Sequence, residues 1–440
     1  MMKSLLIKYA CCLSVFVTLA GYPTVVLATI NLPEIIQLAL KRDAQLRADT
    51  FAAEARNVDG WQSVAGYGPT LTASGASMRS RDSFQPEDSA KMEDRLAKFN
   101  EGEIKVGLEQ PVVDLEKGSK ALQGMAEMDI AELLKKKARE DLLIKVHERY
   151  YAILSAQEAH RLAREESAAL QKQLLNAEDK LELGFGTITN KYDTEARYRL
   201  SLAAEIARKT DLDNAKKALE EVIDQEITCE LEDLQPDMVL PDVPKDLATW
   251  LEISGAANID INIKELQLKT AQLEYRGMQS RFLPTLVLFA DYNERYPDNG
   301  LFGYGEERSE LDVGLRLEAK ILSGGRDTAA AIAAGKRVKA AEARATAAKR
   351  AMNRSVRSLW ESIRQTRELI AAYQQAVTAN EKALESTQAA YDEGAKVLLD
   401  VLNAQQDYYR SQRQYKTSRY DYMILLEKFR QVVGVETVCL

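Results

Sequence analysis

The fold of this chain is decided by the stretch from Tyr391 to Cys439, YDEGAKVLLDVLNAQQDYYRSQRQYKTSRYDYMILLEKFRQVVGVETVC. A weaker copy lies 210 residues earlier, from Leu181 to Cys229, and reads LELGFGTITNKYDTEARYRLSLAAEIARKTDLDNAKKALEEVIDQEITC. Each copy has a glycine turn, a capping position and a long helical run; the matched pairs are Gly184 with Gly394, Asn190 with Asp400, Leu219 with Phe429, and Cys229 with Cys439. A repeat of about half the chain indicates a duplicated fold rather than a solenoid of short units.

The composition favours long solvated helices. The chain has 440 residues, a formal charge of −8 and 29% charged residues, with only 22 glycines and 10 prolines. These breakers cluster at a few places, so helices far longer than the globular mean of about 11–12 residues are possible. The acidic balance gives no sign of a basic nucleic-acid-binding face, and no nucleic-acid partner is expected.

Residues 1–28 have the pattern of a secretory signal peptide. Lys3 and Lys8 precede an apolar run, and Ala28 is a small residue suited to cleavage. The competing interpretation is a lipoprotein anchor on Cys11 or Cys12, although Lys8 stands where such a signal has small or apolar residues. No later stretch has the roughly 20 apolar residues of a spanning helix. The chain is therefore expected to be exported, and to enter a membrane only as strands.

Two cysteines lie outside the signal segment, at the ends of the two copies. Cys229 and Cys439 either form a disulfide, which an oxidising compartment permits, or each ends its own helix as a separate thiol. The sequence leaves both arrangements open.

The first half, residues 29–230, is expected to contain three helical regions and one hairpin. Helices are predicted over Leu32–Ala65, with an apolar stripe that includes Phe51 and Ala55, over 115–183, and over about 187–224 with Thr189 or Asn190 as cap. The 115–183 segment lacks proline and would be roughly 100 Å long. A hairpin is predicted at about 70–110 with a polar loop from Phe84 to Phe99, and residues 231–246 form a proline-containing linker.

The second half, residues 247–440, repeats this plan. Helices are predicted over Leu247–Phe282, about 324–393 and about 398–433, and a hairpin over about 285–318 with a loop from Tyr296 to Arg308. In both halves a proline follows the first helix, at Pro69 and Pro284.

The strands alternate apolar residues with charged or small ones. An isolated hairpin is marginally stable in water, so both hairpins need partners. Alternation of this kind is typical of a transmembrane barrel, whose apolar side faces lipid and whose polar side faces the lumen. Four strands are too few for a barrel, but three chains would supply twelve. The other interpretation is a soluble hairpin cap on a coiled coil.

The chain resembles the TolC family of outer-membrane channel proteins over essentially its whole length after the signal segment. The resemblance rests on Tyr391-Asp392-Glu393-Gly394 with Asp400-Val401-Leu402-Asn403-Ala404-Gln405, on Gly184 with Thr189-Asn190, on Leu283-Pro284-Thr285-Leu286, and on Asp213-Asn214-Ala215 and Asp421-Tyr422. The last repeat is most similar to the branch that serves type I protein secretion.

The resemblance implies a mainly α-helical fold with a small membrane β-barrel. Three duplicated chains of long coiled-coil helices and two hairpins would form a twelve-stranded outer-membrane barrel and an α-helical periplasmic tunnel. The implied partners are the chain itself as a homotrimer, a periplasmic adaptor, an inner-membrane transporter and outer-membrane lipid. The implied location is the outer membrane, with a large periplasmic part.

The family also implies a periplasmic entrance at the turns that contain Gly184 and Gly394. By position, Tyr391 and Lys396 match the tyrosine and arginine of the family's lock, and Thr189 and Asn190 match their partners. Asp400 and Asn403 match two rings of aspartates. Asparagine replaces aspartate at positions 190 and 403, so one carboxylate ring, from Asp400, remains. Such a ring favours cations, although a carboxylate there also suits an ordinary helix N-cap.

No catalytic, cofactor-binding or metal-ligating pattern is present in the sequence. The histidines are His147 and His160, and no His-Glu-x-x-His, Cys-x-x-Cys, phosphate loop or nucleophile elbow occurs. The expected activity is passive export through a tripartite system, with type I protein secretion favoured over efflux of small molecules. In a different class, the chain would be an exported coiled-coil structural or adaptor protein without a pore.

Overall fold

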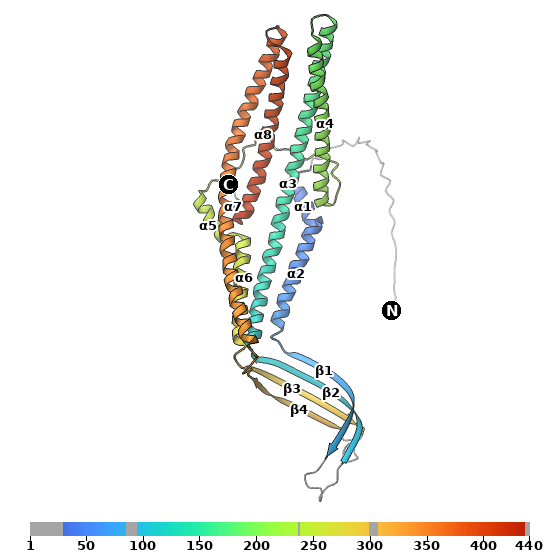
Figure 1. The fold of residues 1–440 in the computed structure, drawn as a ribbon, viewed down its shortest axis with the longest axis vertical. Helices are drawn as coiled ribbons and strands as arrows, with labels where there is room; N and C mark the ends of the chain where they lie inside the picture. The colour runs from blue at the N-terminus through green and yellow to red at the C-terminus, as the bar shows by residue number, and fades with distance from the viewer. Residues whose placement is uncertain (1–29, 85–94, 236–237, 299–306, 436–440) are drawn as a thin grey trace, which may run out of the picture.

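The computed structural model describes residues 30–84, 95–235, 238–298 and 307–435. The predicted signal peptide and Cys439 lie outside these residues. The described part forms two helices, two strands and two helices, and then the same order again (Figure 1). The elements are α1 (Leu32–Arg42), α2 (Ala44–Ala65), β1 (Thr70–Phe84), β2 (Arg95–Val113), α3 (Leu115–Glu182), α4 (Ile188–Ile223), α5 (Leu247–Ala257), α6 (Ile259–Ser280), β3 (Thr285–Pro297), β4 (Arg308–Glu318), α7 (Arg326–Asp392) and α8 (Leu398–Val433).

Two very long helices determine the shape. α3 has 68 residues and α7 has 67, which at 1.5 Å per residue gives about 100 Å each. α4 folds back along the upper half of α3, and α8 folds back along α7 (Figure 1). The turns of these two helical hairpins lie at one end of the molecule and the sheet lies at the other. The long helices end within a residue or two of their predicted bounds.

The two shorter helical regions are each broken in two, which the sequence did not predict. Asp43 separates α1 from α2 with ψ 121°, and its carboxylate accepts the Leu46 N–H at 2.6 Å. Asn258 separates α5 from α6 in the same way, and its side chain accepts the Ile261 N–H at 3.0 Å. Each buried side chain caps the second helix, because Asp and Asn compete with the helical hydrogen-bond pattern.

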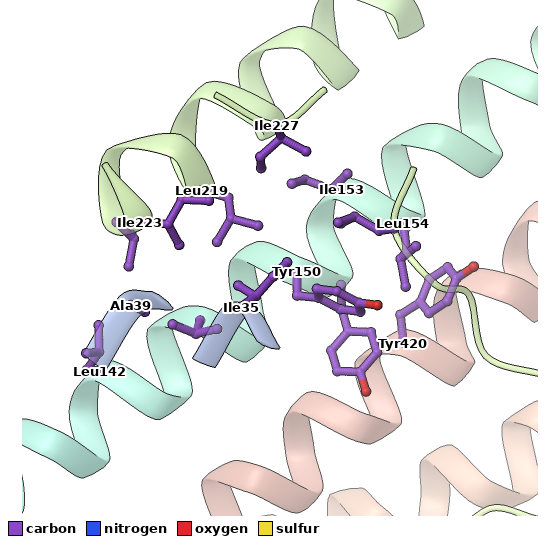
Figure 2. Packing of buried hydrophobic residues seen from close by; sticks show 14 residues of the cluster. Ile35, Ala39, Leu142, Tyr150, Ile153, Leu154, Leu219, Ile223, Ile227 and Tyr420 are labelled. Atoms are coloured by element: carbon purple, nitrogen blue, oxygen red, sulfur yellow. The ribbon is translucent and has the colours of Figure 1, made fainter. Parts of the chain in front are cut away.

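Two hydrophobic clusters lie at the middle of the long axis, where the short helices meet the long ones. In the first, Ile35 of α1 packs with Val146 and Ile153 of α3 and with Leu219 of α4, and each of them is at most 1% exposed. Figure 2 shows this cluster, which also includes Tyr150 of α3 and Tyr420 of α8. The second cluster joins α5, α7 and α8 through Trp250, Val356 and Phe429.

The α2 stripe differs from its prediction. Phe51 is 67% exposed and Ala55 is also exposed, whereas Ala53 and Gly60 face α3. The contact at Gly60 is very close, because a Cβ there would lie 2.6 Å from the Gly124 carbonyl oxygen. The lack of side chains at both glycines lets the two backbones touch, so the seam with α3 uses small residues rather than the bulky ones.

The four strands form one antiparallel sheet in the order β1-β2-β3-β4. β2 and β3 pair across the two halves of the chain, with Ile104 opposite Glu294 and a bulge between Pro111 and Val113. β1 and β4 are the edge strands, and each has one side that no strand of the described residues pairs with. The predicted loops were too long: Phe84 belongs to β1, residues 95–99 to β2, Tyr296 to β3 and Arg308 to β4. Residues 85–94 and 299–306 lie outside the described part.

The sheet has one apolar and one polar face, as the alternation predicted. The register puts the following apolar residues on one face: Leu71, Ile104, Val106, Leu108, Leu286, Leu288, Ala290, Leu311, Val313, Leu315 and Leu317. The other face carries ion pairs, such as Arg316 Nη1 with Glu109 Oε1 at 3.0 Å and Arg295 Nε with Glu103 Oε1 at 3.2 Å. Leu311 and Leu317 are 67% and 70% exposed, so none of the described residues covers this part of the apolar face.

The segment between the halves has no helix from Asp224 to Asp246 within the described residues. Within this segment Leu231 forms a parallel bridge with Ile30, the first of the described residues. The division into repeats at 231–246 stays a prediction, as does the signal peptide.

Candidate entrance at the turns of the helical hairpins

The turns at the far end from the sheet have the same backbone. Gly184 has φ 77° and Gly394 has φ 80°, a left-handed conformation that favours glycine after a helix. The Phe185 N–H donates to the Lys180 carbonyl at 2.8 Å, and the Ala395 N–H donates to the Ala390 carbonyl at 2.8 Å. The two turns are therefore equivalent at the offset of 210 residues found in the sequence.

The helices that follow the turns begin differently from the prediction. α4 is capped by Thr187, whose Oγ1 accepts the Asn190 N–H at 3.2 Å, and not by Thr189 or Asn190. In the second turn the equivalent position is Val397, which has no side-chain acceptor. Asp400 is therefore not an N-cap; it lies at the third helical position, where its Oδ2 accepts the Val397 N–H at 3.4 Å. A carboxylate in this first turn also opposes the positive end of the helix dipole.

Asp400 lies beside Lys396. The Lys396 Nζ is 3.7 Å from Asp400 Oδ2, and the Asp400 side chain is 39% exposed. An exposed pair of this kind contributes little to stability. The Asp400 carboxylate thus remains partly exposed to solvent at the turn.

Tyr391 contacts a lysine instead of the partners that the family resemblance implied. Its ring packs against the cluster of Leu170, Ala177, Leu398 and Leu402. The Lys180 Nζ donates to the Tyr391 hydroxyl at 3.2 Å and lies 4.4 Å from the ring centroid. Within the described chain, Thr189 has no polar side-chain partner, so the single chain does not bring Tyr391 or Lys396 to Thr189 or Asn190.

Asn403 also has a partner that the sequence did not reveal. Arg197 of α4 donates from Nη2 to Asn403 Oδ1 at 3.2 Å, and Gln173 of α3 donates to Gln388 of α7 at 3.4 Å. With Lys180–Tyr391 these pairs form three cross-hairpin contacts, which join the α3–α4 hairpin to the α7–α8 hairpin. Lys180 and Arg197 were missed because about 210 residues separate them from their partners, and no local pattern marks them.

The candidate entrance is acidic. Residues 178–193 and 391–403 contain three amines, Lys180, Lys191 and Lys396, and seven carboxylates, Glu178, Asp179, Glu182, Asp193, Asp392, Glu393 and Asp400. Lys191 Nζ pairs with Glu178 Oε1 at 3.1 Å, and that hydrogen bond raises the pKa of the lysine. The remaining carboxylates outnumber the amines, so the local potential is negative.

Below the turns, the two hairpins are separated by a cavity of about 460 Å³. It is lined by residues of α3, α4 and α8, among them Glu166, Arg197 and Gln405. The Oε1 of Gln405 is buried without a hydrogen-bond partner, and burial raises the pKa of the Glu166 carboxyl. The seam between the hairpins is therefore incompletely filled at this level, beside the apolar cluster that contains Leu170 and Leu402.

The described residues show neither a membrane-spanning helix nor a metal-binding cluster. None of their helices is long and apolar enough to cross a membrane. They contain no group of three or more His, Cys, Asp or Glu side chains arranged to hold a metal ion.

This chain is similar in sequence to a known protein family and to named secretion and outer membrane proteins. The family model described as "Outer membrane efflux protein" matches residues 35–224 and 250–435. The alkaline protease secretion protein AprF of Pseudomonas aeruginosa is 27% identical over 335 residues, which cover 75% of this chain and 69% of that protein. The outer membrane protein TolC of Vibrio cholerae is 28% identical over 306 residues, 67% of this chain and 68% of that protein.

The fold matches solved structures over nearly the whole chain. The outer membrane protein VceC of Vibrio cholerae aligns with a TM-score of 0.79 at 17% identity, over 92% of this chain and 96% of that one. These relatives are channels and secretion proteins rather than enzymes, and TolC-like channels of this kind imply trimeric assembly in tripartite systems. The chain belongs to the outer membrane efflux protein family and is a TolC-like outer-membrane export channel with a large periplasmic helical part.

Proposed function

We propose that three copies of this chain form the outer-membrane conduit of a type I protein-secretion system. The observation that carries the proposal is the four-stranded sheet, which is apolar on one face, polar on the other and unpaired at both edges. Protein cargo is favoured because AprF is a protease secretion protein, and 75% of this chain aligns with it.

The sheet needs other copies of itself. Unpaired strand edges and an exposed apolar face are unstable in water. Known transmembrane barrels have at least eight strands, so one chain cannot close a barrel and three chains would give twelve strands. In such a barrel β4 of one chain pairs with β1 of the next. The apolar face then meets lipid and the ion-paired face lines the lumen.

The hairpin turns, at the opposite end, form the periplasmic entrance. Three Asp400 carboxylates would surround the axis there and favour cations over anions. The cross-hairpin contacts hold each chain's two hairpins together in the closed state. Thr189 and Asn190, for which the described residues offer no side-chain polar partner, would bond with Tyr391 or Lys396 of a neighbouring copy.

The same turns offer a docking surface for partner proteins. Phe185 is 85% exposed in the first turn and Val397 is 61% exposed in the second. Exposed apolar residues at a turn are typical of protein contacts. We assign this surface to a periplasmic adaptor, which joins the conduit to an inner-membrane transporter. The channel itself is passive, so its partners select the cargo.

The test is single-channel recording of the purified trimer in planar bilayers. We expect discrete, mostly closed, cation-preferring steps, and Asp400→Asn should reduce the cation preference. Asp407→Asn is the matched control, since Asp407 is exposed on the same helix two turns away. Equal cation selectivity in the wild type, Asp400→Asn and Asp407→Asn would show that Asp400 does not line the entrance. A folded trimer without conductance would refute the channel.

The cargo is tested separately in cells. Deleting the gene should remove one or more proteins from the culture medium while leaving susceptibility to small toxic molecules unchanged. Increased susceptibility with an unchanged set of secreted proteins would refute protein secretion in favour of small-molecule efflux.

A further inference from the structure

The segment between β4 and α7 contains the two most exposed large apolar side chains at this end of the described structure. Ile321 is 96% exposed and Leu322 is 89% exposed. They lie in residues 319–323, which form no helix, strand or turn. Two cationic side chains flank them: Lys320 is exposed, and Arg326 keeps 72% of its side chain exposed while contacting Asp327 at 3.5 Å.

We propose that Ile321 inserts into the periplasmic leaflet of the outer membrane, with Lys320 and Arg326 at the phospholipid phosphates. This inference rests on the proposed placement of the sheet in the membrane. The partner is a glycerophospholipid surface, and the contact would continue the lipid-facing side of the sheet.

Continuity of the sequence pattern is the first argument. The apolar face of β4 consists of the odd-numbered residues Leu311, Val313, Leu315 and Leu317. Ala319 and Ile321 extend this alternation past the end of the strand. On β3 the apolar face uses even-numbered residues, and Leu286 is opposite Leu317. Phe282, which is 55% exposed, lies four residues before Leu286, just as Ile321 lies four residues after Leu317.

The thickness of the membrane is the second argument. From Leu311 to Leu317 the strand advances about 20 Å at roughly 3.3 Å per residue, which is about 15 Å of height at a tilt of about 40°. The apolar band of an outer-membrane barrel is about 25 Å tall. Continuing in extended conformation to Ile321 gives about 33 Å along the chain and about 25 Å of height. β4 therefore matches the band only when Ile321 is included.

The charges are the third argument. A cationic side chain next to an apolar one suits the boundary between acyl chains and phosphates, because the long side chain reaches the headgroups while its neighbour enters the hydrocarbon. Arg326 begins α7, and Arg281, the residue after α6, pairs with Glu116 Oε1 of α3 at 2.7 Å and with Asp327 Oδ1 of α7 at 3.5 Å. These ion pairs hold the helix ends at the junction, so the exposed segment projects from a fixed base.

Spin-label accessibility tests the inference. In the full chain with its four cysteines replaced by serine, single cysteines are introduced as Ile321→Cys, Val313→Cys and Ile332→Cys, and the labelled trimers are placed in vesicles of phosphatidylethanolamine and phosphatidylglycerol. Val313 represents the apolar face of the sheet. Ile332, 62% exposed on α7, represents an apolar side chain beyond the membrane.

We expect labels at 313 and 321 to collide more with oxygen than with a water-soluble nickel chelate, and the label at 332 to show the reverse. If 321 behaves like 332 while 313 faces lipid, the inference is wrong and the barrel stands. If 321 is shielded from both reagents, a neighbouring copy covers it and the inference is also wrong. If 313 is accessible to nickel, the membrane placement of the sheet, and with it the proposed function, is refuted.

Discussion

Replacing Lys180 by methionine tests whether the cross-hairpin contacts keep the entrance closed. The change keeps an unbranched apolar side chain that reaches as far as the former Cε, and it removes the ammonium group. That group donates to the Tyr391 hydroxyl at 3.2 Å and lies 4.4 Å from the ring centroid. This contact connects α3 of one hairpin to α7 of the other, so it must break if the hairpins move apart.

The structure sets the size of the effect. An exposed cation–π contact is worth about 0.5–1 kcal/mol and a hydrogen bond about 0.5–1.5 kcal/mol. Because Lys180 is exposed, about 1 kcal/mol per chain is appropriate after solvent screening. If the three chains open independently, each hairpin pair opens about fivefold more often. If they open together, about 3 kcal/mol is lost and the ratio of open to closed states rises about 150-fold.

The assay is open probability in planar bilayers, with Lys172→Met as control. Lys172 is exposed on the same helix and has no ion pair within the described residues. Combining Lys180→Met with Tyr391→Leu should open the channel no further than Tyr391→Leu alone, since the lysine then has no ring to contact. Equal open probability in wild type and Lys180→Met, or full additivity in the double variant, would refute the reasoning.

Two other predictions concern stability. Gly124→Ala should destabilise the chain by about 1–3 kcal/mol in denaturant unfolding, because the Gly124 backbone touches Gly60. The control Gly255→Ala, with open space around its Cβ, should be neutral or stabilising by up to about 1 kcal/mol. Equal effects of the two substitutions would contradict the close packing. Burial raises the pKa of Glu166 above its ordinary 4.5, so the folded state loses stability as the pH rises through the raised pKa. Glu166→Gln should therefore flatten the fall of thermal stability above pH 4.5 and raise the melting temperature at pH 7 by about 1 °C; a variant with an unchanged pH profile would show that Glu166 is solvated.

The long helices and the two-faced strands could be predicted from sequence because their periodicity is local and sustained. The 115–183 segment has no proline, and the alternation around Leu315 has period two. The breaks at Asp43 and Asn258 could not be seen in this way, since a single Asp or Asn is tolerated inside a helix and caps only when tertiary packing rewards it. The same holds for Thr187, one residue before the α4 helix.

The candidate entrance was predicted only in part. The turns at Gly184 and Gly394 were found because a positive φ selects glycine in both copies. The contacts made by Tyr391 and Asn403 were not found, because Lys180 and Arg197 belong to the other hairpin and their proximity depends on how α3 packs against α8. Contacts between hairpins depend on the fold as a whole, whereas turns depend on a few neighbouring residues.

The uninterrupted length of α3 and α7 makes each of them a lever. A rigid rod of about 100 Å that pivots by one degree at the membrane end moves its far end by about 1.8 Å. A tilt of three degrees at the junction would thus shift Tyr391 by more than a hydrogen-bond length, with no change inside the helix. A small change of angle where the helices leave the sheet, near Arg281 and Asp327, would therefore produce a displacement of several ångströms at the entrance.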